Sequence, residues 1–140
     1  MFNIIEYVLK TEDNRVAISE DGRVRVEDVS LNSYLEKLAN ARLSTLAGRI
    51  KAIRRVFGFD AKAPLYLGQG TLFLVLYGIR SPRALLVNVY AINCYKPMGQ
   101  GLVISFRNGH EMLFCSFAIF RKAFEKAGLL IEWLQEANIP

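Results

Sequence analysis

"TLFLVLYGIRSPRALLVNVYAI", residues 71–92, places two apolar runs on either side of a short basic loop. The runs TLFLVLY and ALLVNVYAI are rich in Leu, Val and Tyr and are bounded by Gly, Ser and Pro, which is typical of strands. Three further runs of this kind, LYLGQ, LVISFR and EMLFCS, lie within residues 65–116. We therefore expect four or five strands of a mostly antiparallel sheet in this half of the chain.

Two residue pairs predict tight hairpins, Asp21-Gly22 and Asn108-Gly109. A two-residue type I′ turn needs positive φ at both central positions, which Asn, Asp and Gly adopt at the lowest cost. In the second hairpin this register sets Arg107 opposite His110. It predicts a core face made of Leu102, Ile104, Phe106, Leu113 and Cys115, with Phe114 on the opposite, mixed face.

Apolar residues recur at helical spacing in three segments. The first follows Ser30, an expected N-cap. The second is basic, spans residues 43–57 and ends before Gly58, a residue favoured just past a helix C-terminus. Its apolar stripe contains Leu43, Leu46, Ile50, Ile53 and Phe57. The third, roughly residues 117–137, carries a wide aromatic stripe and an exposed Trp133.

Gly48 interrupts the basic helix and costs it about 1 kcal/mol relative to alanine. We expect some close approach to require this glycine, either of a packed strand or of a phosphate that reaches Arg49.

Composition fits one α+β domain that spans residues 1–140. The chain is 52% hydrophobic and 22% charged, values typical of a globular protein. No apolar run approaches the roughly 20 residues of a membrane-spanning helix, and the N-terminal stretch lacks the features of a signal peptide. Two cysteines, Cys94 and Cys115, are too few for a disulfide framework, so we expect two buried thiols in a reducing cytoplasm.

Catalytic and metal-binding motifs are absent from the sequence. The central acids Asp60 and Glu111 are far apart in the chain, and the one histidine, His110, is expected at an exposed hairpin tip. Neither Gly68-Gln69-Gly70 nor Gly99-Gln100-Gly101 continues into a phosphate loop or a dinucleotide fingerprint, so both predict turns. We expect no enzymatic activity, no metal site and no cofactor.

Charge is distributed unevenly along the chain. Residues 42–122 hold twelve basic and two acidic side chains, although the whole chain has a net charge of only +5. Such a block repels itself, and an acidic partner such as duplex DNA would relieve the repulsion. The Arg80-Ser81-Pro82-Arg83 loop sets two guanidinium groups on one turn. The predicted DNA-binding residues are Arg49, Lys51, Arg54, Arg55, Lys62, Arg80, Arg83 and Arg107.

The order of features along residues 44–134 resembles the ComK family of competence transcription factors. A Gly-Arg pair lies in a basic helix, a proline precedes a strand, an Arg/Ser turn and a strand with an asparagine follow, and a helix with phenylalanines comes after an Asn-Gly hairpin. The matching residues are Gly48, Arg49, Pro64, Ser81, Arg83, Asn88, Phe106, Asn108, Gly109 and Phe120.

This resemblance implies a cytoplasmic transcription activator of genetic competence. Members of the family bind A/T-rich DNA through the minor groove, act as oligomers and are regulated by adaptor-mediated proteolysis. The expected partners are therefore double-stranded DNA, further copies of the chain as a homo-oligomer, and a proteolytic adaptor, with no membrane. The alternative is a protein-interaction module that uses the apolar C-terminal helix and binds no DNA.

Overall fold

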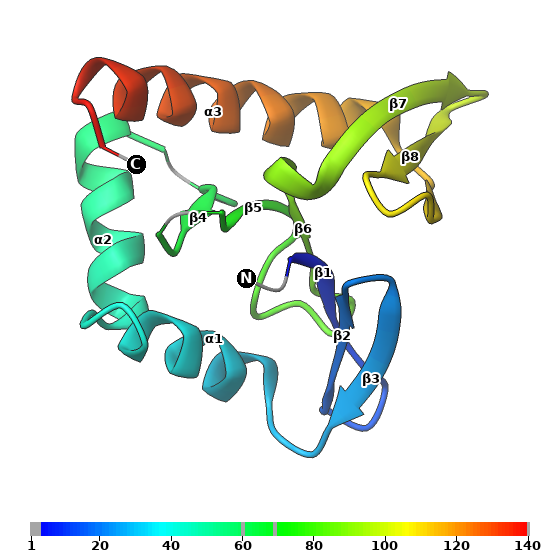
Figure 1. Ribbon diagram of the computed structural model, residues 1–140, viewed down its shortest axis with the longest axis horizontal. Helices are drawn as coiled ribbons and strands as arrows, with labels where there is room; N and C mark the ends of the chain where they lie inside the picture. The colour runs from blue at the N-terminus through cyan, green and yellow to red at the C-terminus, as the bar shows by residue number, and fades with distance from the viewer. Residues whose placement is uncertain (1–3, 60, 69, 140) are drawn as a thin grey trace.

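The computed structural model describes residues 4–59, 61–68 and 70–139. It has an α+β fold with mostly antiparallel sheets and a long C-terminal helix, as the sequence predicts (Figure 1). The strands are β1 (Ile5–Lys10), β2 (Val16–Glu20), β3 (Arg23–Glu27), β4 (Leu65–Tyr66), β5 (Leu72–Tyr77), β6 (Leu85–Asn88), β7 (Ile92–Met98), β8 (Gly101–Phe106) and β9 (Glu111–Phe114). The helices are α1 (Leu31–Asn40), α2 (Leu46–Phe57) and α3 (Phe117–Glu136), with a 3₁₀ turn, η1 (Val89–Ala91).

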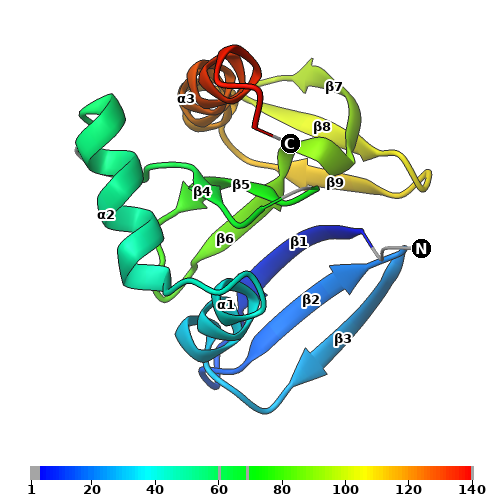
Figure 2. The same cartoon turned by 60° about the vertical axis from the view of Figure 1, so that its left-hand side comes forward.

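A six-stranded antiparallel sheet in the order β3-β2-β1-β6-β5-β4 forms the middle layer. Helix α1 covers one of its faces, while α3 and a three-stranded sheet, β7-β8-β9, lie over the other (Figure 2). Helix α2 runs beside β4 from α1 to α3, so that Leu46 packs in the core on the α1 side and Ile53 in the core on the α3 side. Strand β5 is buried on both faces, which explains its unbroken apolar sequence. Leu72, Leu74 and Leu76 face α3, whereas Phe73 and Val75 face the other helices.

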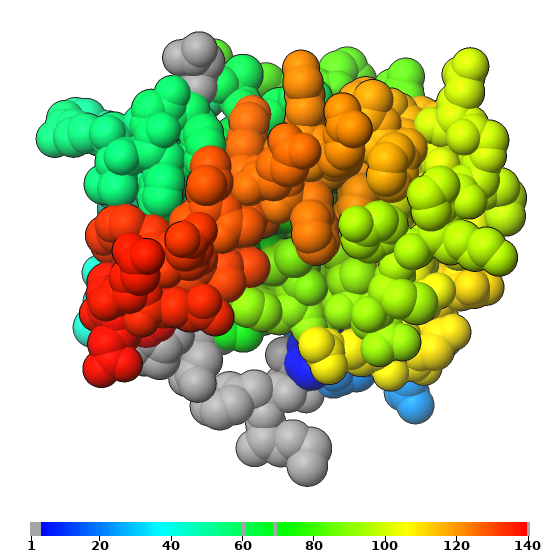
Figure 3. All heavy atoms as spheres, turned by 90° about the horizontal axis from the view of Figure 1, so that it is seen from above, coloured from blue at the N-terminus to red at the C-terminus, as the bar shows by residue number. Residues whose placement is uncertain are grey.

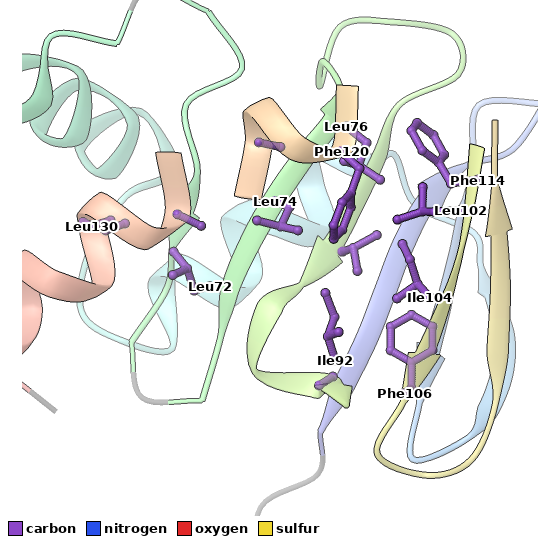
Figure 4. Close-up of a cluster of buried hydrophobic side chains, with 14 of the residues drawn as sticks. Leu72, Leu74, Leu76, Ile92, Leu102, Ile104, Phe106, Phe114, Phe120 and Leu130 are labelled. Carbon is purple, nitrogen blue, oxygen red and sulfur yellow. The ribbon is translucent and has the colours of Figure 1, made fainter. Parts of the chain in front are cut away.

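The core between the two sheets is built around α3. Phe120 is fully buried and points from α3 toward the leucines of β5 and toward Leu102 and Ile104 of β8 (Figure 4). Its ring also lies 5.4 Å from that of Phe124 and 5.0 Å from that of Tyr95 on β7. The aromatic stripe predicted for the C-terminal helix is therefore mainly core, and Trp133 is 40% exposed, as expected.

Asn88 ends β6 and uses the whole hydrogen-bonding capacity of its buried side chain. Its Oδ1 accepts from the backbone N–H groups of Leu72, at 3.1 Å, and Tyr90, at 3.2 Å. Its Nδ2 donates to the carbonyl oxygens of Ile5, at 2.8 Å, and Gly70, at 2.9 Å. One side chain thus joins β1, β5, η1 and the turn between β4 and β5.

The first predicted hairpin is confirmed and the second has a different register. Asp21 and Gly22 have φ values of 51° and 80°, as a type I′ turn requires. In the second hairpin Asn108 does not adopt positive φ, and the loop contains three residues. The N–H of Phe106 donates to the carbonyl oxygen of His110 at 2.8 Å, and the carbonyl oxygen of Phe106 accepts from the N–H of Gly109 at 2.9 Å. Arg107 therefore does not face His110.

A slip of one residue transfers every side chain of a strand to the other face. Phe114 is buried opposite Leu102, whereas Leu113 is 70% exposed, so the predicted core face is correct for β8 and wrong for β9. Cys115 and Cys94 are both exposed. The expectation of two buried thiols is wrong, because Cys115 lies just past the end of β9 and Cys94 lies on an edge strand.

Strand β7 was not predicted. Its sequence INCYKPM alternates poorly and contains Pro97, which an edge strand tolerates because one side of the strand needs no hydrogen bonds. The run ALLVNVYAI is also divided, since η1 turns the chain after Asn88 out of the large sheet. The turn predicted at Gly99 is confirmed by its φ of 61°. The turn predicted at Gly68-Gln69-Gly70 includes Gln69, which lies outside the described residues, as does Asp60.

The helix ends follow capping chemistry. Ser30 accepts from the N–H of Ser33 and caps α1 as predicted, and Gly58 ends α2 with a φ of 71°. However, α2 begins at Leu46 rather than near residue 43, because Thr45 caps it and Leu43 is 98% exposed with positive φ. A Cβ on Gly48 would lie 2.8 Å from the Thr45 hydroxyl. The close approach at this glycine is thus made by the cap, and not by a strand.

Replacing Asn88 by alanine should lower the free energy of unfolding by about 3 kcal/mol, because buried backbone groups would lose their partners. Chemical denaturation followed by circular dichroism measures this. Asn32→Ala, at an exposed position of α1, is the control and should change the stability by less than about 0.5 kcal/mol. Equal effects of the two substitutions would contradict the role assigned to Asn88.

Candidate nucleic-acid interface

One edge of the large sheet is only partly closed. Strand β4 pairs with Leu72 and Phe73 of β5, and no other described strand lies beyond β5. The rest of this edge is crossed by the segment that follows α2, where the Nζ of Lys62 donates to the carbonyl oxygen of Leu76 at 3.4 Å. The segment therefore lies against the unpaired part of β5.

Two open cavities lie on either side of this crossing. The first, of about 540 Å³, lies next to α1 and α2 and is lined by Arg54, Lys62 and Arg80, among others. The second, of about 590 Å³, lies next to α3 and is lined by Lys62, Lys122 and Lys126, among others. Both include Ala61, Lys62 and Val75, so they meet at Lys62. We call this surface, with its cations Arg54, Lys62, Arg80, Lys122 and Lys126, the strand-edge groove.

The groove brings together side chains from four separate segments. Arg54 comes from α2, Lys62 from the crossing segment, Arg80 from the β5–β6 loop, and Lys122 and Lys126 from successive turns of α3. In the space-filling view, which looks onto the outer face of α3 (orange to red), α2 lies beside this helix in green (Figure 3). Positive charges from distant parts of the sequence thus collect along one strand edge.

Negative charge in the described part of the groove comes from a single side chain, Glu36. Both of its carboxylate oxygens lie 3.3 Å from the backbone N–H of Leu46, at the start of α2. The partial positive charge of a helix N-terminus offsets part of a carboxylate's charge. The groove is therefore strongly positive overall.

Lys126 also holds the groove in shape. Its Nζ donates to the carbonyl oxygen of Ala61 at 2.7 Å and lies 5.7 Å from the centre of the Phe59 ring. This contact fixes the crossing segment to α3. Lys62, one residue after Ala61, is thereby positioned over the edge of β5.

Five of the eight predicted DNA-binding residues lie in or beside the groove. Arg54, Lys62 and Arg80 line it. Lys51 and Arg55 are exposed on α2, and residues three or four positions apart are neighbours on a helix surface. They extend the positive charge of Arg54 along the outside of α2.

Arg49 makes contacts that fix the fold. Its Nε donates to the hydroxyl of Ser44 at 2.9 Å, and its Nη1 donates to the carbonyl oxygen of Tyr66 at 3.1 Å. The guanidinium also lies 5.7 Å from the centre of the Tyr66 ring. Arg49 therefore attaches α2 to β4.

Arg83 and Arg107 are not among the residues that line the groove. Arg83 lies over the ring of Tyr77, 4.5 Å from its centre, and donates to the Tyr77 hydroxyl at 2.8 Å. That hydroxyl lies 3.0 Å from the Cys115 sulfur, and this hydrogen bond raises the pKa of Tyr77. Arg80 and Arg83 belong to the same β5–β6 loop, but Arg80 lines the groove whereas Arg83 packs on Tyr77.

Arg107 occupies a separate position near the first hairpin. Its Nε donates to the carbonyl oxygen of Tyr90 at 2.9 Å, and it lines a small cavity with Asp21 and Asn108, among others. The eight predicted cations thus do not form one continuous face.

Sequence reasoning did not include Lys122 and Lys126 among the predicted site residues. Their spacing of four residues on a predicted helix was visible, since such residues lie on the same side of the helix. What the sequence did not indicate is that this side of α3 meets the segment around Lys62.

Other kinds of site find little support. Within residues 4–59, 61–68 and 70–139 no cluster of His, Cys, Asp and Glu could hold a metal ion, and no described helix is both long and apolar enough to cross a membrane. His110 is exposed, as predicted. No family model, no curated protein and no solved structure matches this chain.

Replacing Arg49 by alanine should lower the free energy of unfolding by about 1–2 kcal/mol, because the Tyr66 carbonyl and the Ser44 hydroxyl lose their donor. Lys51→Ala removes the same charge from an exposed position and should cost less than about 0.5 kcal/mol. Thermal and urea unfolding of both variants measures the difference. An Arg49→Ala variant as stable as Lys51→Ala would exclude the attachment role.

Proposed function

We propose that this chain is a transcription regulator of the ComK type that binds duplex DNA through the strand-edge groove. The observation that carries the proposal is the convergence of five cations from four segments around one strand edge, with a single described carboxylate among them. Lysine and arginine that neutralise phosphates supply most of the affinity of proteins for DNA.

The groove has the chemistry to hold a phosphate backbone. Arg54 and Arg80 offer planar, bidentate donors for phosphate oxygens, and the lysines act as compact point charges. Contacts of this kind position a protein on the duplex without reading its sequence. Preference for A/T-rich sites would then come from an arginine that enters the narrow minor groove of such sequences, and Arg80, exposed on the β5–β6 loop, is the residue we propose for this role.

The wider proposal follows from the resemblance to the ComK family. We propose that the protein acts in the cytoplasm as a homo-oligomer that activates competence genes. A proteolytic adaptor delivers it for degradation, and it has no catalytic activity in this proposal. Arg49, Arg83 and Arg107 do not line the groove. The residues that we propose to contact DNA are therefore Arg54, Lys62, Arg80, Lys122 and Lys126, with Lys51 and Arg55 beside them.

A second candidate function is protein interaction through the C-terminal half of α3. Val56 and Trp133 are both exposed, and they line an almost entirely apolar cavity of about 170 Å³ between α2 and α3. The Trp133 ring packs edge-on against Phe57, with 6.0 Å between the ring centres. Failure of the protein to bind heparin or DNA resin at low salt would favour this function.

Replacing Lys62 and Arg80 together by alanine should reduce duplex affinity and its dependence on salt. Each phosphate contact contributes about 0.9 to the slope of log affinity against log salt concentration, so the slope should fall by about 1.8. Fluorescence anisotropy with an A/T-rich duplex, measured between low and moderate salt, gives both quantities.

The control removes the same charge elsewhere, by Lys96→Ala and Arg107→Ala together, and both side chains are exposed. This variant should keep the affinity within a few-fold of the unmodified chain. If both double variants weaken binding equally, net charge and not the groove determines affinity. If the unmodified chain binds with no salt dependence, the proposed function is wrong.

A further inference from the structure

Strand β3 forms the opposite edge of the large sheet, and four of its five residues are exposed. Val24 is 57% exposed and Val26 is 48% exposed. No strand among the described residues pairs with its outer side, and Figure 2 shows it at the rim of the sheet. It is paired with β2 without any bulge and contains no proline.

Edge strands of this kind attract further strands, and proteins usually protect them by shortness, charged side chains, proline or bulges. The other edges here are protected in those ways: β4 has two residues, β7 contains Pro97 and β9 has four residues. Strand β3 is regular, five residues long and free of proline, so its charged residues Arg23, Arg25 and Glu27 are the protection that it has. Its openness calls for a partner strand.

The backbone of β3 shows which of its groups a partner would meet. The residues that flank a two-residue turn form a hydrogen-bonded pair, and bonding then alternates along the hairpin. The pairs of Arg23 with Glu20 and Arg25 with Ile18 therefore bond inward to β2. The N–H and C=O groups of Val24 and Val26 point away from the sheet and are available to another strand.

The side chains of β3 complement a second copy of the same strand. If two copies pair antiparallel about Arg25, Val24 lies opposite Val26 of the other copy, and both residues present outward-facing backbone groups. Arg23 then lies opposite Glu27 of the other copy, twice because of the symmetry. Opposite charges directly across a strand pair stabilise the pairing, and a two-fold axis is the usual symmetry of such contacts.

The central Arg25 would face its own copy, which alone would oppose the pairing. Arg25 is already neutralised within its own chain, because its Nη1 lies 2.6 Å from Glu20 and its Nε lies 3.3 Å from Glu27. Pairing about Val24 would instead set Arg23 against Arg25 twice and would leave fewer residues in contact. Pairing about Arg25 uses all five residues of the strand.

We propose that two copies of this chain associate through β3, in antiparallel register about Arg25, to form one continuous sheet. The four valines then cover one another on one face, and the two Arg23–Glu27 pairs close the ends. This inference deepens the homo-oligomer in the proposed function, yet it rests on the β3 edge alone, and its tests contain no DNA. The contact is short, so association at micromolar rather than nanomolar concentration is expected.

Val26→Pro tests the edge directly. Proline removes an N–H group that does not bond to β2, so the hairpin should persist while pairing between copies is lost. Sedimentation equilibrium over a range of concentrations should show the unmodified chain rising toward twice its mass of 15.8 kDa, and the variant should stay monomeric with an unchanged circular dichroism spectrum. Leu129→Lys, at an exposed position of α3, is the control and should still associate.

Two charge reversals test the register. Arg23→Glu and Glu27→Arg should each weaken self-association at least tenfold, because like charges then face each other at both ends. A mixture of these two variants should restore association, since the two end pairs, of residue 23 with residue 27, are again of opposite charge. A single chain that carries both reversals should also associate.

Three results would overturn the proposal. The unmodified chain could remain monomeric at all concentrations, Leu129→Lys could abolish association while Val26→Pro does not, or the two charge variants could fail to associate when mixed. Each of these results leaves the DNA-binding proposal standing, because the strand-edge groove contains no residue of β3.

Discussion

The four hydrogen bonds of Asn88 are the constraint on which the rest of the structure depends. A buried amide is stable only when its donors and acceptors are all paired, and here the partners belong to four different parts of the chain. By capping η1, the side chain ends β6 and turns the backbone out of the large sheet. The following strand, β7, therefore starts a second sheet beside α3, and the core cluster of Figure 4 depends on that turn.

The partly open edge of β5 is a second consequence of the same arrangement. Asn88 fixes the start of β5 and the turn that leads into it from β4, and β4 ends after two residues. The remaining backbone of β5 is reached by a lysine instead of a strand. A cationic side chain is long enough to cover an edge while its stem packs on apolar surface. The groove around Lys62 thus follows from incomplete strand pairing together with the basic composition of the nearby segments.

The sequence predicted the fold class because period, turn and capping signals are local. Ser30, Gly58 and the Asp21-Gly22 turn each act within a few residues, and each appears as predicted. The Asn108-Gly109 hairpin shows the limit, because loops of two and three residues both place glycine at positive φ, yet they differ by one in register. The exchange of Leu113 and Phe114 follows from that difference. Phe114 packs against Tyr77, with 5.4 Å between the ring centres, and this partner lies 37 residues earlier in the sequence.

The sequence indicated that the candidate site is basic, but it did not indicate which basic residues form it. A block of positive charge is visible in the composition, but whether a guanidinium faces solvent or a carbonyl oxygen depends on distant contacts, as Arg49 and Tyr66 show. If two copies join through β3, nine strand spacings separate their β5 strands, about 43 Å along the sheet before twist. One turn of duplex DNA spans only about 35 Å. A DNA molecule that met both grooves would therefore have to contact sites more than one turn apart, or the twist of the joined sheet would have to bring the grooves closer together.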